Sequence, residues 1–146
     1  MKKLLIAMTV CCFWLQTQAA DLNWGTDLPK ALAQAKTDNN MVLLDFTGSD
    51  WCGWCMKFDK DTLSKEKFAD YAKTHLELVV VDFPDKKPQS AALKAANKAL
   101  GVKYGVNGYP TFVVLNADGK EIGRQEGYAA GGPEAFIAKL EKFSKQ

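Results

Sequence analysis

The sequence predicts an α/β fold, with a mixed sheet of about four strands and helices on both of its faces. Two nearly continuous apolar runs, at residues 41–46 and 76–82, are typical of strands buried on both sides. A helical pattern separates them, which favours a parallel pair, whereas a turn motif at residues 116–119 favours an antiparallel hairpin. With 47% hydrophobic and 25% charged residues, the chain can build one such domain.

The elements up to the second strand are expected to begin with a helix. Asp27 is an N-cap residue, Pro29 suits a first helical turn, and Asn39-Asn40 ends the helical pattern. After the first strand and a loop, Cys52 opens a second helix. Ser64 is expected to cap a further helical segment that leads into the second strand.

The remaining elements alternate between loop, helix and strand. Residues 83–89 contain two prolines and three charges, which predicts a surface loop. An Ala-rich helix follows, and Gly101 is expected to end it. Strands are predicted at residues 111–115 and 120–125, and Pro133 begins the last helix.

The first residues have the pattern of a signal peptide. Two lysines precede an uncharged, mostly apolar stretch at residues 4–15, which is too short for the roughly 20 residues of a membrane span. Thr17 and Ala19 supply the small residues of a cleavage site after Ala19. We therefore expect a signal peptide at residues 1–19, a domain at residues 20–146, and a periplasmic or secreted protein. An uncleaved anchor is the alternative.

The charge distribution does not suit a nucleic-acid-binding protein. The formal net charge is +2, but Lys2 and Lys3 belong to the expected signal peptide. The 17 basic side chains that remain balance the 17 acidic ones, and no basic stripe interleaved with aromatic residues is left. We expect no nucleic-acid partner.

Cys52 and Cys55 are the only cysteines beyond the expected signal peptide. Two cysteines three residues apart lie on one face of a helix. The first would sit at the helix N-terminus, where unpaired N–H groups favour a thiolate, and the second would lie deeper. A bridge over two residues closes too small a loop to stabilise the fold much. The pair therefore predicts exchange chemistry, with Cys52 as nucleophile and Cys55 as resolving cysteine.

Other cysteine chemistries lack their partners in this sequence. Haem attachment needs a histidine directly after the second cysteine, where Met56 stands, and structural zinc needs four ligands. His75, the only histidine, is expected to decorate a helix end. We expect no cofactor and no metal, although Cu(I) or Zn(II) transfer by the two thiols remains an alternative.

Three motifs together resemble the thioredoxin superfamily, and more narrowly the exported bacterial thioredoxin-like proteins with a CGWC centre. They are Asp45-Phe46, Trp51-Cys52-Gly53-Trp54-Cys55 and Gly108-Tyr109-Pro110-Thr111. The resemblance implies the three-layer thioredoxin-like fold and a cis peptide between Tyr109 and Pro110, placed against the disulfide. It also implies that Asp45 is a buried carboxylate that relays a proton to and from Cys55.

The residues around the thiols suggest how a client would bind. Trp51 and Trp54 could form an apolar docking surface, although Trp54 could instead pack on the fold. The backbone of Tyr109 would pair with an extended client segment, because Pro110 has no N–H. Six residues separate Asp45 from Cys52, one more than in ordinary thioredoxins. The extra residue could bulge the loop or turn the Asp45 side chain away from the thiols.

Taken together, these features predict an exported thiol–disulfide oxidoreductase that reduces protein or peptide disulfides. The Gly53-Trp54 dipeptide provides no histidine beside Cys52, which favours a mildly to strongly reducing couple. The loop at residues 83–89 is longer than the family minimum, and its Lys86-Lys87 is expected to be a solvated tip. We expect a monomer that draws electrons from a membrane thiol reductant. A disulfide oxidase or isomerase and a non-catalytic binding or chaperone module are the alternatives.

Overall fold

The computed structural model describes residues 22–146. The expected signal peptide at residues 1–19 lies outside this range and stays a prediction, as does the domain boundary that follows it. Across the described residues, no helix has both the length and the apolar character that a membrane crossing demands.

The four strands form one mixed sheet in the order β2-β1-β3-β4. The central strand β1 (Met41–Thr47) pairs in parallel with β2 (Leu76–Asp82) and antiparallel with β3 (Thr111–Leu115). The edge strand β4 (Glu121–Glu126) continues the sheet antiparallel to β3. The mixed α/β sheet is therefore confirmed, with the parallel pair and the hairpin where the sequence predicted them.

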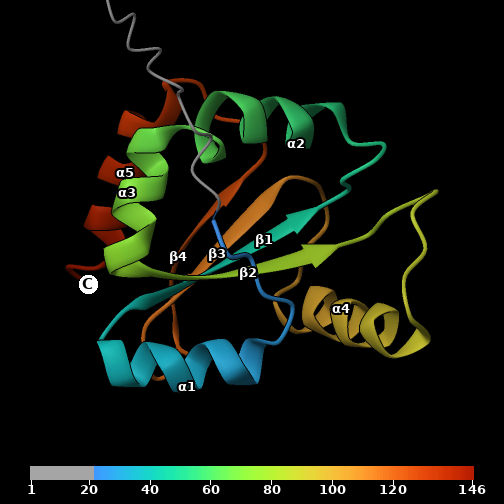
Figure 1. Cartoon of the computed structure of the whole chain (residues 1–146), viewed down its shortest axis with the longest axis horizontal. Helices are drawn as coiled ribbons and strands as arrows, with labels where there is room; N and C mark the ends of the chain where they lie inside the picture. Colours follow the sequence, from blue (N-terminus) through green and yellow to red (C-terminus); the bar gives the residue numbers. More distant parts are fainter. Residues whose placement is uncertain (1–21) are drawn as a thin grey trace, which may run out of the picture.

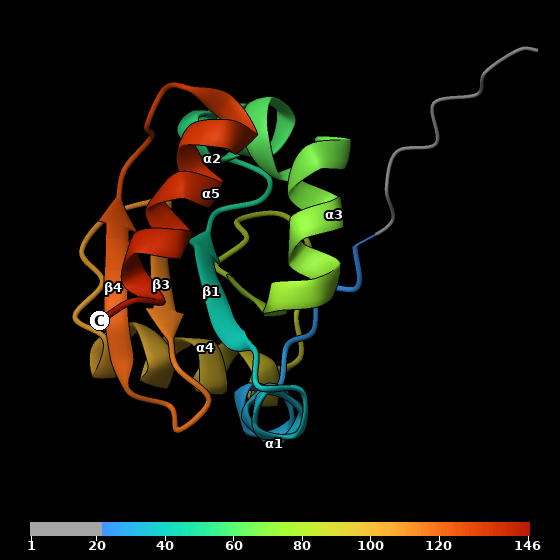
Figure 2. The ribbon, with the colours of Figure 1, turned by 90° about the vertical axis from the view of Figure 1, so that its left-hand side faces the viewer.

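Helices cover both faces of this sheet, giving three layers (Figures 1 and 2). One face carries α1 (Leu28–Asp38) and α4 (Ala91–Lys103). The other carries α2 (Gly53–Phe58), α3 (Glu66–His75) and α5 (Gly132–Phe143). The helix that begins as α2 widens into a π-helical turn, η1 (Asp59–Leu63), before α3 starts.

Strand β1 is buried along its whole length because helices cover both of its faces. Its side chains alternate between the layers. Leu43 packs with Phe58 and Phe112 under α2, α3 and α5, and Leu44 packs in the core under α1 and α4. The same alternation turns Asp45 toward the layer of α2. The strand ends at Thr47, directly before the loop that leads to the cysteines.

Two helix boundaries differ from those predicted. Helix α4 continues through Gly101, which packs against the ring of Phe83, and the left-handed residue after its end is Gly105, with φ of 61°. Ser64 does not cap α3. Its N–H instead donates to the carbonyl of Asp59 at 2.8 Å and closes the π-helical turn. A π turn leaves no periodic signal in a short helix.

Alanine at the two glycines should change stability in opposite directions. Gly101→Ala should raise the free energy of unfolding by up to about 1 kcal/mol, because alanine is the better helix former. Gly105→Ala should lower it by about 1 kcal/mol, because a β-carbon is strained at positive φ. Urea titrations of the two variants measure both effects. Equal and unfavourable effects would contradict a helix that runs through Gly101.

Candidate active site

Cys52 and Cys55 form a disulfide at the N-terminus of α2, with their Cα atoms 5.3 Å apart. Cys52 is the N-cap residue, and its Sγ accepts the backbone N–H of Cys55 at 3.2 Å. Once the bond is reduced, this N–H and the helix dipole favour a thiolate at Cys52. Both cysteines are 6% exposed, so exposure does not separate them as the sequence suggested.

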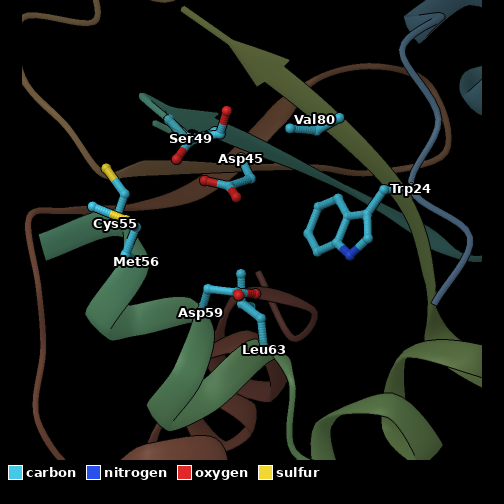
Figure 3. Close-up of a pocket in the computed structure, with 9 residues that line it drawn as sticks. Trp24, Asp45, Ser49, Cys55, Met56, Asp59, Leu63 and Val80 are labelled. Carbon is cyan, nitrogen blue, oxygen red and sulfur yellow. The ribbon is translucent and has the colours of Figure 1, made fainter. Parts of the chain in front are cut away.

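The two cysteines differ in their contact with a pocket of about 210 Å³ behind the disulfide. Cys55 lines this pocket and Cys52 does not (Figure 3). Asp45 projects into this pocket from β1, and Asp59 lines it from the opposite side. Met56 lies beside Cys55 at its wall. The longer loop before the cysteines therefore leaves Asp45 on the side of Cys55.

The Asp45 carboxyl group has an environment that favours its neutral form. The pKa of Asp45 is raised from 3.8 to about 8, chiefly by burial of the carboxyl group and in smaller part by the negative charges of Asp59 and Asp82. Among residues 22–146, its Oδ1 has no hydrogen-bond partner. An acid with a pKa near neutrality can both accept and return a proton at physiological pH.

The Tyr109-Pro110 segment lies beside the loop that carries the cysteines. The peptide bond between these residues is cis, and Pro110 is buried. The Pro110 carbonyl accepts the N–H of Gly127 at 2.7 Å. The ring of Tyr109 meets the ring of Trp51 edge-on, with centroids 5.7 Å apart, which joins this segment to the residue next to Cys52.

Two groups of aromatic side chains include Trp51 and Trp54, the neighbours of the two cysteines in the sequence. The first group, here called the Trp51 wall, consists of Trp51, Phe83 and Tyr109, with Phe83 and Tyr109 centroids 5.3 Å apart. The second consists of Trp54 and Tyr128, with centroids 5.2 Å apart. Trp51 is 49% exposed and Trp54 is 60% exposed, so Trp54 contacts the fold and still presents a large surface to solvent.

Two residues of this region were not found by sequence reasoning. Asp59 lies four residues after Cys55, and this spacing places both on one side of a helix, so a signal for it was present. Tyr128 gave no local signal because it lies in the loop after β4. It is held by its hydroxyl group, which donates to Asp61 at 3.0 Å.

His75 lies at a helix end, and Lys86-Lys87 form an exposed loop tip, as predicted. His75 is the last residue of α3, and its ring stacks on Tyr71 with centroids 4.3 Å apart. The side chains of Lys86 and Lys87 are exposed.

The three-layer fold, the Cys-x-x-Cys disulfide at the start of a helix and the cis-proline after Tyr109, whose ring contacts Trp51, define a protein of the thioredoxin class. The chain belongs to the thioredoxin-like domain family, which matches it over residues 28–144. It is 38% identical to the disulfide bond reductase DsbH of Chlamydia pneumoniae over 127 residues, which cover 87% of this chain and 75% of that protein.

Two further comparisons agree with this placement. The chain is 32% identical to the thiol:disulfide interchange protein DsbD of Pectobacterium atrosepticum, over 88% of this chain but 21% of that protein. A solved structure of a DsbH oxidoreductase superposes with a TM-score of 0.80 at 34% identity, covering 94% of this chain and 95% of that one. The chain is thus a thioredoxin-superfamily disulfide oxidoreductase of the bacterial type.

Asp45→Asn should remove a pH dependence of stability. The pKa of Asp45 is higher in the folded chain than in the unfolded chain, so the unfolded chain binds fewer protons between pH 4 and pH 8. The free energy of unfolding of the wild-type chain therefore falls as the pH rises through this window. The stability gain of the variant should grow with pH, reaching on the order of 4 kcal/mol at pH 7.

Urea titrations of the oxidised protein at several pH values measure this gain. The matched control is Asp118→Asn, at an exposed carboxylate in the β3–β4 turn, for which no growing gain is expected. A difference between Asp45→Asn and the wild type that stays constant from pH 4 to pH 8 would contradict the prediction.

Proposed function

We propose that this protein is an exported thiol–disulfide oxidoreductase that reduces the disulfide bonds of protein or peptide clients. The observation that carries the proposal is the Cys52 sulfur at the N-cap of α2, with Cys55 behind it in a pocket shared with Asp45. The likeness to a disulfide bond reductase over 87% of the chain supports the reducing direction.

The first step is attack of the Cys52 thiolate on one sulfur of the client disulfide. A new S–S bond forms between Cys52 and the client, the client's own S–S bond breaks, and the departing client sulfur leaves as a thiolate that takes a proton from water. The N–H of Cys55 stabilises the attacking thiolate before the step.

The second step uses Cys55 as the resolving nucleophile. Asp45, in its ionised form, accepts the proton of the Cys55 thiol, because it lines the same pocket and has a pKa near the working pH. The Cys55 thiolate attacks the Cys52 sulfur, and the second client sulfur leaves as a thiolate. Two electrons have then passed to the client, and the chain holds its Cys52–Cys55 disulfide.

Client binding would use the surfaces beside the disulfide. The Trp51 wall and the Trp54–Tyr128 pair offer apolar surface to the residues on either side of a client cysteine. The backbone of Tyr109, beside the cis-proline, would pair with an extended client segment.

The cycle requires a source of electrons outside the cytoplasm. We place the mature chain in the periplasm or outside the cell, on the strength of the signal-peptide pattern at residues 1–19. A membrane thiol carrier would return the disulfide to the dithiol form. We expect the chain to act as a monomer, without metal or cofactor and without nucleic acid.

Cys55→Ser should trap mixed disulfides with clients. Without a resolving thiol the first step still forms the mixed disulfide but the second step cannot occur, so client proteins should stay bound through Cys52 and shift in non-reducing electrophoresis. Cys52→Ser is the matched control and should trap far less. If Cys55→Ser forms no adduct with the exported proteins of its host, the exchange mechanism is wrong.

The reduction potential tests the direction of electron flow. The Cys52–Cys55 couple should lie near the −270 mV that is typical of thioredoxin, because no histidine adjoins Cys52 to stabilise the thiolate further. Equilibration with glutathione and dithiothreitol buffers measures it. A value near −120 mV, typical of a dithiol oxidase, would reverse the proposed direction.

A further inference from the structure

A carboxylate next to the active-site loop binds a second loop through its backbone. Asp50 Oδ1 accepts the N–H of Asp85 at 2.8 Å, and Oδ2 accepts the N–H groups of Lys86 and Lys87 at 2.8 Å each. Three consecutive backbone donors thus converge on one side chain, an arrangement here called the Asp50 clasp. Such bonds to a carboxylate are among the stronger hydrogen bonds in proteins.

The neighbouring residue extends the same connection. Ser49 donates its backbone N–H and its hydroxyl to the Asp82 carboxylate, at 2.9 Å and 2.6 Å. Lys87 Nζ donates to Ser49 Oγ at 3.2 Å. The loop before the cysteines and the loop after β2 are therefore joined by several hydrogen bonds, although more than 30 residues separate them along the chain.

The clasped loop in turn holds Trp51. The Trp51 indole N–H donates to the Phe83 carbonyl at 2.7 Å, and the Phe83 ring packs against Tyr109. On its other side the indole lies over Gly48, where an added β-carbon would come within 2.4 Å of the ring. The position of the Trp51 indole is thus defined by Gly48 on one side and by the Phe83 carbonyl of the clasped loop on the other.

We propose that Asp50 is a positioning residue for client binding. By gathering the three N–H groups of residues 85–87, it fixes the Phe83 carbonyl that orients Trp51, and so prepares the Trp51 wall beside Cys52. Asp50 itself does not touch the sulfurs. This inference rests on the proposed function, because it assigns the wall to the docking of clients.

The test follows single-turnover oxidation of the pre-reduced protein by two disulfides. One is a ten-residue peptide dimer linked by a disulfide, which needs the wall, and the other is hydroxyethyl disulfide, which is too small to use it. In Asp50→Ala the peptide concentration for half-maximal rate should rise roughly tenfold. The maximal rate, and the rate with hydroxyethyl disulfide, should change by less than about twofold.

Two further variants separate the clasp from simple charge. Asp85→Ala removes a carboxylate from the same loop but leaves the backbone N–H that Asp50 binds, so its half-saturation should match the wild type. Asp50→Asn keeps one acceptor oxygen and should fall between the wild type and Asp50→Ala. An equal loss in Asp85→Ala would overturn the proposal in favour of local charge.

Nuclear magnetic resonance reports on the wall without any client. In Asp50→Ala, solvent exchange of the Trp51 indole N–H should accelerate at least roughly tenfold, because its acceptor is no longer held in place. Unchanged exchange with unchanged peptide half-saturation overturns the proposal, as does an equal loss with both disulfides. If the wild-type protein reduces neither disulfide, the proposed function itself is wrong, and this inference fails with it.

Discussion

Burial of β1 on both faces is the constraint on which the rest of the molecule depends. Helices from both layers cover this strand, and every one of its residues is buried. The burial organises the core, and it also takes the carboxyl group of Asp45 out of water. The strand then ends where the active-site loop begins. The centre of the scaffold and the carboxyl group proposed to relay the proton thus come from one continuous segment.

Burial of the Asp45 carboxyl group lowers the stability of the fold but favours the proposed proton transfer. A leucine at position 45 would suit the core better than an acid whose Oδ1 has no partner among the described residues. The acid is held at a cost that rises with pH, because ionising it in place is unfavourable. An exposed aspartate would cost nothing and would be ionised at neutral pH, so it could not return a proton there. Burial of the Asp45 carboxyl group is therefore the origin both of the loss of stability and of the pKa that the proposed proton transfer needs.

The sequence was informative wherever a pattern is local. Apolar runs identified β1 and β2, and the spacing of Cys52 and Cys55 identified the reactive pair before any contact was known. The Asp50 clasp could not be found this way, because it joins backbone groups of one loop to a side chain of another, and neither loop has a periodic pattern. Tyr128 likewise reaches Trp54 only through the folding of the chain. Contacts between loops depend on where the strands place their ends, which single-sequence patterns do not encode.

The π-helical turn sets the helical phase behind the disulfide. Cys55, Asp59 and Leu63 all line the pocket, at intervals of four residues. In a regular α-helix eight residues rotate about 80° beyond two full turns, so Leu63 would point well away from the direction of Cys55. The wider turn absorbs this excess rotation, and the bond from the Ser64 N–H to the Asp59 carbonyl closes it. The lining of the pocket is therefore set by the main chain, and a one-residue deletion in this turn would move Leu63 away from it without replacing Asp45 or Asp59.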